Sequence, residues 1–393
     1  MNTIKNEKAQ EWMLAIILFF MTNPCFVWFT PIPVISTLLF YLIAIVFREV
    51  VHPIYVLGYL LFTFFYILVG LRYGFSLSLI YTFAIPLILL MDKPFLCKGF
   101  NKFVQILSIT LTLSLIVYIM VVLIGISMPH VSINPLNPLR NDTGKGYEMY
   151  PFLLIATYSE FRGDILQRFS GMYDEAGVVG TMNAIILVAN NYKLKEIKYI
   201  PIFLTGLFSF SLYFFVITIF YYIVTMKKSN VLTYLFFASI ILYAISFIPG
   251  IDYLVYDRFL IEDGVWKGNS RDAGDYAQWF SRFRDTSDYY FGLGPGANLV
   301  HNPGGASYKD VIVNYGVIMF SIYIFSWLVF IIRTQKGIIN IAIVSMTIMG
   351  CIFQRPFITD VFMQLSFLYL LFNTRVKFLP KRTSKLYELS GSK

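Results

Sequence analysis

Residues 103–127 read FVQILSITLTLSLIVYIMVVLIGIS, an apolar run that contains no charged side chain. A helix that crosses a membrane needs about 20 predominantly apolar residues in a row. Runs of this kind recur along the chain, which is 58% hydrophobic, 18% aromatic and only 13% charged. Because soluble domains carry about 25% charged residues, the composition excludes a soluble globular protein. We expect an all-α polytopic membrane protein.

Ten apolar runs are direct candidates for spans by length and flanking charge. They are 11–29, 33–47, 50–71, 75–91, 103–127, 175–192, 229–250, 310–332, 337–353 and 357–373. The further run 199–226 would be about 42 Å long as one helix. Lysines flank both of its ends, so the positive-inside rule places both ends in the cytoplasm. The run must then cross twice, with a turn near Ser209 and Ser211, and we expect about twelve spans.

This scheme predicts a single integral membrane domain over 1–393 with both termini in the cytoplasm. Two large outer loops, about 128–174 and 251–309, carry short interfacial helices, and 374–393 forms a cytoplasmic tail. No small-residue cleavage site follows the first apolar run. We therefore interpret that run as a retained span in a bacterial inner (plasma) membrane.

The two membrane faces differ in their basic residues. The outer face has nine Arg and three Lys, whereas the inner face has four Arg and fifteen Lys. The net charge of +9 therefore reflects orientation in the membrane and not nucleic-acid binding. Guanidinium groups bind phosphate or carboxylate in a bidentate fork, so we expect an anionic ligand at the outer face. The alternative is that these arginines pair with the outer carboxylates.

The second outer loop contains a segment, 271–284, with helical periodicity. Arg271, Asp275, Gln278 and Arg282 share one face, and aromatic side chains share another. We predict a helix that lies at the membrane surface, with its aromatic side down toward the membrane and its guanidinium side facing the outer cavity. The alternative is a plain interfacial helix with an Arg271–Asp275 pair.

A glycine-rich stretch follows this helix at 291–298 and precedes His301 and Asn302. Glycines let a backbone approach a ligand closely. A histidine with a pKa near 6.5 can act as a general base toward a sugar hydroxyl. A loop histidine without a catalytic role is the alternative.

Two further places carry charge at the membrane boundary. Arg168 and Glu175 flank the segment 169–174, which runs directly into a span, and Arg355 lies in a tight turn between two spans. Charges at such depth are costly and usually functional. The structural alternative for Arg355 is a pair with Asp360.

The sequence contains no metal-type spacing, P-loop or dinucleotide fingerprint, so we expect no metal and no cofactor. Its three cysteines fall in or beside apolar runs. His52 and His130 lack a surrounding constellation, and we interpret both as structural.

From Arg168 to Glu175 the sequence resembles bacterial Wzy-type O-antigen polymerases, in which an Arg-x-x-Gly motif with a following acidic residue enters a span. The later order of features is also similar to that family. These features are an Arg-bearing outer helix, a Gly-x-Gly segment, the His301–Asn302 pair, the segment Asn314–Gly316, and Gln354–Pro356. The resemblance covers roughly 165–360.

The resemblance implies a GT-C-like fold of the O-antigen ligase/polymerase superfamily and a metal-independent glycosyltransferase. Its substrates would be undecaprenyl-diphosphate-linked oligosaccharides, and its partners the lipid bilayer and a chain-length regulator of the Wzz type. His301 or Glu175 would accept the proton of the acceptor hydroxyl. The residues expected to contact diphosphate or sugar are Arg168, Arg271, Arg282, Arg284, Arg355, Asn302 and Tyr173.

Two rival functions remain open on the sequence. An O-antigen ligase, which transfers finished polymer to lipid A core, would share these arginines and the histidine. A twelve-span flippase or other transporter would have smaller outer loops and polar residues in mid-span. The spans here are nearly free of charge, which favours chemistry at the outer surface.

Overall fold

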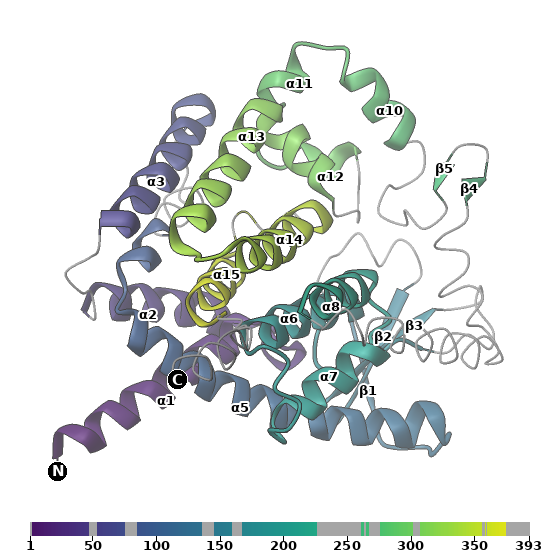
Figure 1. The fold of residues 1–393 in the computed structure, drawn as a ribbon. Helices are drawn as coiled ribbons and strands as arrows, with labels where there is room; N and C mark the ends of the chain where they lie inside the picture. Colours follow the sequence, from purple (N-terminus) through teal and green to yellow (C-terminus); the bar gives the residue numbers. More distant parts are fainter. Residues whose placement is uncertain are drawn as a thin grey trace, which may run out of the picture.

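The computed structural model describes a large part of the chain. The described residues are 2–46, 53–74, 85–135, 145–158, 167–225, 261–262, 265–266, 276–301, 307–355, 358 and 360–374. Helices dominate this part (Figure 1). The α-helices are α1 (Asn2–Met21), α2 (Ile32–Val46), α3 (Pro53–Tyr73), α5 (Lys93–Tyr118), α6 (Ala176–Ala189), α7 (Tyr199–Phe208), α8 (Leu212–Thr225), α10 (Tyr276–Phe283), α11 (Asp288–Phe291), α12 (Ala297–His301), α13 (Tyr308–Thr334), α14 (Ile338–Gln354) and α15 (Val361–Asn373). Short 3-10 helices are η1 (Cys25–Val27) and η2 (Ile85–Leu90), and η3 (Ile119–Leu123) is a π-helical turn that extends α5.

Three stretches of the described chain are long and apolar enough to cross a membrane: Pro53–Tyr73, Lys93–Leu123 and Tyr308–Thr334. Several shorter apolar helices accompany them. This composition agrees with the prediction of an all-α membrane protein. The count of twelve spans stays a prediction, because the run 229–250 and most of 75–91 lie outside the described residues.

The apolar run 199–226 divides into two helices where the sequence predicts a turn. α7 ends at Phe208 and α8 begins at Leu212, and both helices pack against α6. They rise only about 15 and 21 Å at 1.5 Å per residue, whereas the hydrocarbon core is about 30 Å thick. The break is therefore confirmed, and the two crossings stay a prediction.

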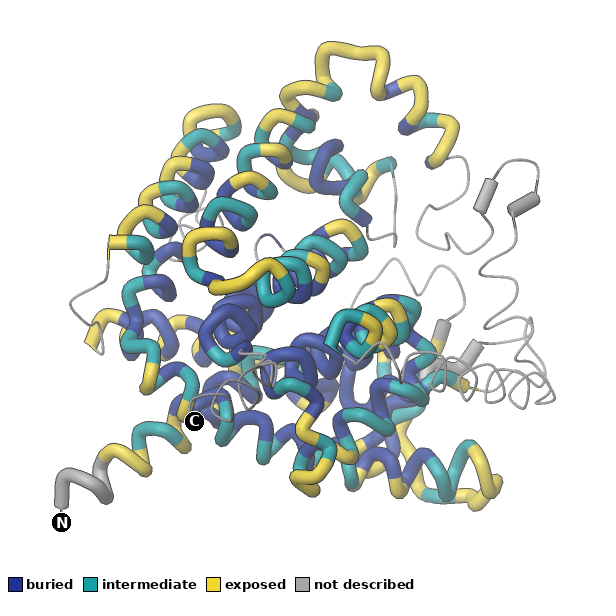
Figure 2. The backbone as a smooth tube through the Cα atoms, in the orientation of Figure 1, coloured by how far each residue is buried: buried dark blue, intermediate teal, exposed yellow. Residues whose placement is uncertain are grey.

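Helices α6 and α15 form the centre of the assembly and are dark along nearly their whole length in Figure 2. In α6 every residue except Val178 is buried, and in α15 every residue except Asn373. Neither helix contains a charged residue. A helix that is apolar on all sides is stable only when other elements surround it, and α7, α8 and α15 pack on α6 in this way.

Contacts between helix termini define two opposite ends of the helix bundle. At one end, which we call the loop end, Tyr118 Oη donates to Gln167 O and Cys25 N donates to Met172 O. The beginning of α6 and the ends of α1 and α5 therefore lie together. At the opposite end, Asn190 Oδ1 accepts hydrogen bonds from the hydroxyls of Tyr199 and Tyr369 at 2.7 and 3.0 Å. α6 therefore runs opposite to α5, and α7 runs opposite to α6.

The first large loop contains a small antiparallel sheet of order β1–β2–β3. Its strands are β1 (Val131–Ile133), β2 (Lys145–Tyr150) and β3 (Leu153–Tyr158), and Tyr150 pairs with Leu153 across a two-residue connection. In this part of the loop the structure has a sheet, whereas the sequence predicted short interfacial helices. The connecting Pro151 and Phe152 are not the Asn-Gly or Asp-Gly pair that signals such a hairpin in a sequence. The second loop contains two short paired strands, β4 (Ile261–Glu262) and β5 (Val265–Trp266).

Candidate functional site

An ion pair joins the end of α14 to the beginning of α6. Arg355 Nη2 lies 2.5 Å from Glu175 Oε2. The Arg355 side chain is 10% exposed and that of Glu175 is 31% exposed. Asp360, the alternative partner suggested by the sequence, accepts a hydrogen bond from Met363 N and caps α15. The charged contact that the structure shows for Arg355 is therefore long-range and not the local one.

Gly177 provides the space for this guanidinium. A Cβ atom built on Gly177 would lie 2.3 Å from Arg355 Nη2, well inside van der Waals contact. Gly177 lies in the first turn of α6, directly after Glu175, the N-cap residue, and Ala176. The small residues at the start of α6 thus let an arginine from another helix pack against its backbone.

Arg168 binds the break between α7 and α8. Its Nε donates to Ser209 O at 2.9 Å and its Nη2 donates to Phe210 O at 3.3 Å. Carbonyl groups at a helix C-terminus lack partners within the helix and carry partial negative charge. The guanidinium group therefore stabilises the end of α7, a structural role that the sequence did not suggest.

The same turn packs on α6 one helical turn beyond Gly177. A Cβ on Gly180 would lie 2.3 Å from Ser211 Cβ and 2.6 Å from Ser209 Oγ. Arg168 and Arg355, which are far apart in sequence, are thereby both brought to the first two turns of α6. We call Arg168, Glu175, Gly177 and Arg355 the α6 cluster.

The segment between Arg168 and Glu175 is held by the sheet and by α1. Tyr147 Oη of β2 donates to Asp174 Oδ1 at 2.7 Å. Ser170 Oγ donates to Leu154 O of β3. Tyr173, a predicted substrate contact, is buried, and its hydroxyl lies 3.3 Å from Oγ1 of Thr22, the residue that follows α1. The structure thus places Tyr173 in the core beneath the cluster.

A second group of predicted residues lies on α10 and α12. In α10 the side chains of Tyr276, Phe280 and Phe283 are buried, whereas Arg282 is exposed, and Arg284 just beyond the helix is exposed too. The aromatic side and Arg282 are thus on different sides of the helix, as predicted, but the aromatic side is buried in the protein and not laid on the membrane. Arg271 and Asn302 lie outside the described residues.

His301 stacks face to face on Trp279, with ring centroids 3.9 Å apart and planes 14° apart. Nearby, Tyr276 Oη donates to Asp310 Oδ1 at 3.1 Å. Lys309 Nζ lies 5.3 Å from the centroid of the Phe280 ring, within the range of a cation–π contact. We call these residues of α10, α12 and the start of α13 the loop cluster.

The glycine-rich stretch approaches a backbone, but it is the backbone of α13. That helix is interrupted at Gly316, where φ is 81° and ψ is 160°. A Cβ on Gly316 would lie 2.3 Å from Tyr290 O, and one on Gly292 would lie 2.6 Å from Asn314 O. Leu293 N donates to Val313 O, one of the carbonyls at the interruption. Gly292 and Gly316 therefore allow the segment after α11 to cross close to the backbone of α13.

The two clusters lie at the same end of the molecule (Figure 1). Phe353, two residues before Arg355, packs edge-to-face on Tyr308 with ring centroids 5.5 Å apart. Tyr308 is the first residue of α13 and precedes Lys309 and Asp310. The sequence motifs around Arg168, Asn314 and Arg355 are thus assembled at the loop end by tertiary structure.

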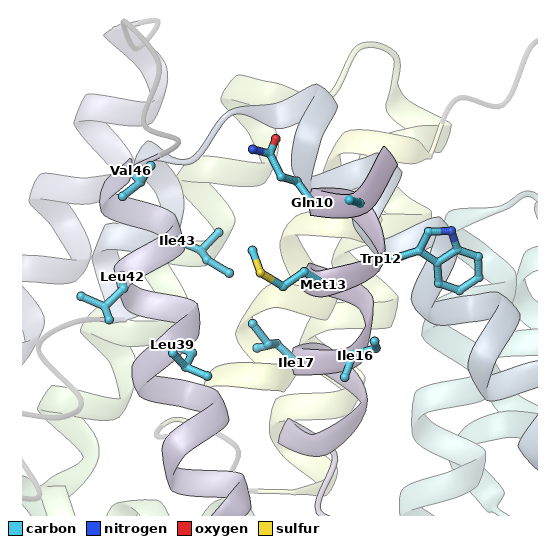
Figure 3. Close-up of a pocket in the computed structure, with 10 residues that line it drawn as sticks. Gln10, Trp12, Met13, Ile16, Ile17, Leu39, Leu42, Ile43 and Val46 are labelled. Atoms are coloured by element: carbon cyan, nitrogen blue, oxygen red, sulfur yellow. The ribbon is translucent and has the colours of Figure 1, made fainter. Parts of the chain in front are cut away.

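A groove between α1 and α2 lies far from this chemistry. Figure 3 shows the side chains that face it, from Gln10 to Ile17 of α1 and from Leu39 to Val46 of α2. They are almost entirely apolar, as is expected for a surface that contacts lipid. In the part of the chain that the structure describes, no cluster of His, Cys, Asp and Glu side chains could hold a metal ion.

No protein-family model, curated protein or solved structure matches this chain.

Proposed function

We propose that this protein is a polymerase of surface polysaccharide, such as O-antigen, that joins undecaprenyl-diphosphate-linked repeat units at the outer face of a bacterial inner membrane. The observation that carries the proposal is the α6 cluster, in which Glu175 and Arg355, 180 positions apart, form an ion pair, and Arg168 binds the turn that packs on the same helix. All three residues belong to the segments in which the sequence resembles Wzy-type polymerases. A shared function requires these segments to lie close together.

The reaction transfers the growing chain from its lipid carrier to the next unit. The bond between the anomeric carbon and the diphosphate oxygen breaks, and a bond forms from that carbon to an acceptor hydroxyl oxygen. The hydroxyl proton passes to a base, and the diphosphate lipid leaves with the bonding electron pair. Because diphosphate is a good leaving group, the main tasks of the protein are positioning and stabilisation of negative charge.

The geometry suggests a division of roles. Arg355 is mostly buried but ends beside the partly exposed Glu175, so its guanidinium can donate to a diphosphate oxygen next to the carboxylate. Glu175 then orients Arg355 as a positioning residue. Arg168 holds the break between α7 and α8 against α6. His301, half-buried on Trp279, takes the proton of the acceptor hydroxyl.

The central helices carry no charged side chains along their length, and the charged residues near them lie beyond the helix ends. α6, α7, α8 and α15 contain no Asp, Glu, Lys or Arg. Transport pathways are usually lined by polar or ionisable groups within the spans. This distribution supports surface chemistry over a flippase.

The proposal is tested by the length distribution of surface polysaccharide on a gel. A deletion strain is complemented with wild type, Arg355→Ala, Arg355→Lys or Arg333→Ala at matched membrane levels. We expect deletion and Arg355→Ala to leave lipid A core with a single repeat unit. Arg355→Lys keeps the charge but loses the fork, so we expect shortened chains. Arg333→Ala, at an exposed arginine in the last turn of α13, serves as the control.

Other outcomes assign other functions. Long lipid-linked polymer that accumulates without attachment to lipid A core would identify a ligase. Unchanged long chains on lipid A core in the deletion strain would refute both glycosyl-transfer functions. Loss of single repeat units from the outer face, with accumulation inside, would identify a flippase.

A further inference from the structure

Helix α12 has its polar side chains toward the protein and its apolar side chains outward. Asn314 Nδ2 donates to Asn298 Oδ1 at 2.8 Å, and His301 stacks on Trp279. Leu299 and Val300, in contrast, are 55% and 76% exposed. A surface helix in water has the opposite arrangement, with its apolar side chains against the core. The outward face of α12 therefore suits hydrocarbon better than water.

This apolar face continues on the neighbouring elements. Leu293, which leads into α12, is 43% exposed. The adjacent Gly294 lies against α3, because a Cβ on it would be 3.7 Å from Tyr73 Cδ1. On α3, one of the three membrane-length helices, Phe64 and Leu71 are 54% and 71% exposed. The segment that leads into α12 thus lies against the end of a membrane-length helix whose outward residues are apolar.

The end of α3 marks the level at which α12 lies. Arg72 and Tyr73 occupy its last turn, and the Arg72 guanidinium carbon lies 4.9 Å from the centroid of the Phe291 ring. Aromatic residues concentrate where hydrocarbon meets headgroups, and arginine side chains reach toward the headgroups from there. From Gly316 to Thr334 the second part of α13 rises about 27 Å, close to the thickness of the hydrocarbon core. Asn314, which holds α12, is therefore at the boundary of the bilayer.

We infer that α12 is a membrane-contacting element, with Leu299 and Val300 inserted among the lipid chains of the leaflet at the loop end. The occupant of this surface is bilayer lipid. The hydrogen-bonded Asn298 and the stacked His301 form the opposite, protein-facing side. The inference depends on exposure and packing, and it holds whichever reaction the protein catalyses.

Nitroxide labels in the full-length protein, reconstituted in phospholipid vesicles, test the inference. Cysteines replace Val300 or Leu299, and each is compared with two labelled controls, Phe64→Cys on α3 and Gln278→Cys on the exposed side of α10. All four replaced side chains are exposed or outward-facing, so the substitutions leave the packing intact. The unsubstituted protein measures labelling of its own cysteines, of which Cys25 and Cys351 are buried.

We expect the labels at 299 and 300 to collide with oxygen, which concentrates in lipid, and to lose collisions with a water-soluble nickel chelate, as at position 64. The label at 278 should show the reverse. Chelate collisions at 300 that match those at 278 would overturn the inference. Spectral broadening between labels at 300 that disappears on dilution with unlabelled protein would overturn it too, because a second copy would then cover this face.

Discussion

The α6 cluster and the loop cluster both lie at the loop end, yet they use arginine in opposite ways. In the α6 cluster the guanidinium groups of Arg168 and Arg355 point into the protein, toward helix-end carbonyls and a carboxylate. In the loop cluster Arg282 and Arg284 point outward, and aromatic stacking and backbone contacts hold the elements together. The arginines at the loop end therefore form two groups that differ in their contribution to stability.

Because of this difference, the contribution of an arginine to stability can be measured separately from its contribution to ligand binding. Replacing an inward-pointing arginine leaves the group that it bound unpaired in an apolar environment, so we expect stability and function to fall together. Replacing an outward arginine removes little from the folded state. Substitutions in the two clusters can therefore show which arginines contact a substrate and which hold the fold.

The largest effect is expected in the loop cluster, for Gly316→Ala. The new Cβ would collide with Tyr290 O, at a backbone conformation that strongly favours glycine. We expect a loss of about 4 kcal/mol in the free energy of unfolding, from backbone strain and overpacking together. The measurement is unfolding by sodium dodecyl sulfate in mixed micelles.

Gly337→Ala is the matched control for this substitution. Gly337 has a similar φ of 85°, but a Cβ on it would meet nothing within 4 Å. Strain alone should then cost about 2 kcal/mol. Equal losses in the two variants would show that the crossing with Tyr290–Gly292 adds nothing to the stability of α13.

The next largest effect is expected in the α6 cluster, for Arg355→Ala. Removal of this guanidinium leaves Glu175 without its ion-pair partner, and we expect a loss of about 3 kcal/mol. A double variant with Glu175→Ala should lose less than the sum of the two single variants. Additive losses would contradict a direct interaction of the two side chains.

A pair of Tyr→Phe substitutions compares the two clusters by removing the same group, a tyrosine hydroxyl that donates to an aspartate, near each of them. Tyr147 donates to Asp174 beside the α6 cluster, and Tyr276 donates to Asp310 in the loop cluster. Each variant loses one hydrogen bond to a carboxylate group, so we expect each to cost about 1.5 kcal/mol in unfolding free energy. If Tyr147→Phe also shortens the polysaccharide while Tyr276→Phe does not, the α6 cluster is the one coupled to the reaction.

The smallest effect on stability is expected for Arg282→Ala and Arg284→Ala. Both side chains are exposed, and surface substitutions usually change stability by no more than about 0.5 kcal/mol. Thermal unfolding in detergent and polysaccharide length are measured on the same preparations. Shortened chains at unchanged stability would assign these arginines to substrate binding, and a large loss of stability would show that they support the fold.

The sequence predicted several parts of the fold because the signals are local. Apolar runs identified the long helices Pro53–Tyr73 and Tyr308–Thr334, and the turn expected near Ser209 and Ser211 lies at the break between α7 and α8. Helical periodicity separated the aromatic side of α10 from Arg282, although the aromatic side was expected on the membrane and is buried in the protein instead. The sheet at 131–158 was missed because its connection, Pro151 and Phe152, is not a pair that signals a hairpin in a sequence.

The candidate site was predicted only as a set of residues. That Arg168, Glu175 and Arg355 carry charge at a membrane boundary follows from hydropathy, which depends on neighbouring residues alone. Their partners do not follow from it. Arg168 binds carbonyls at the end of α7, and Arg355 bypasses the nearby Asp360 for the distant Glu175.

The sequence by itself determined that this is a helical membrane protein with charged segments gathered outside the spans, because hydrophobicity and its period are properties of short stretches. Only the tertiary structure decided which charges meet. Gly177 and Gly180 let α14 and the turn after α7 approach the backbone of α6, and Gly292 and Gly316 let two chain segments cross. Such contacts depend on how surfaces from distant parts of the chain fit together. Because protein interiors are closely packed, glycine is needed where a side chain would have no room.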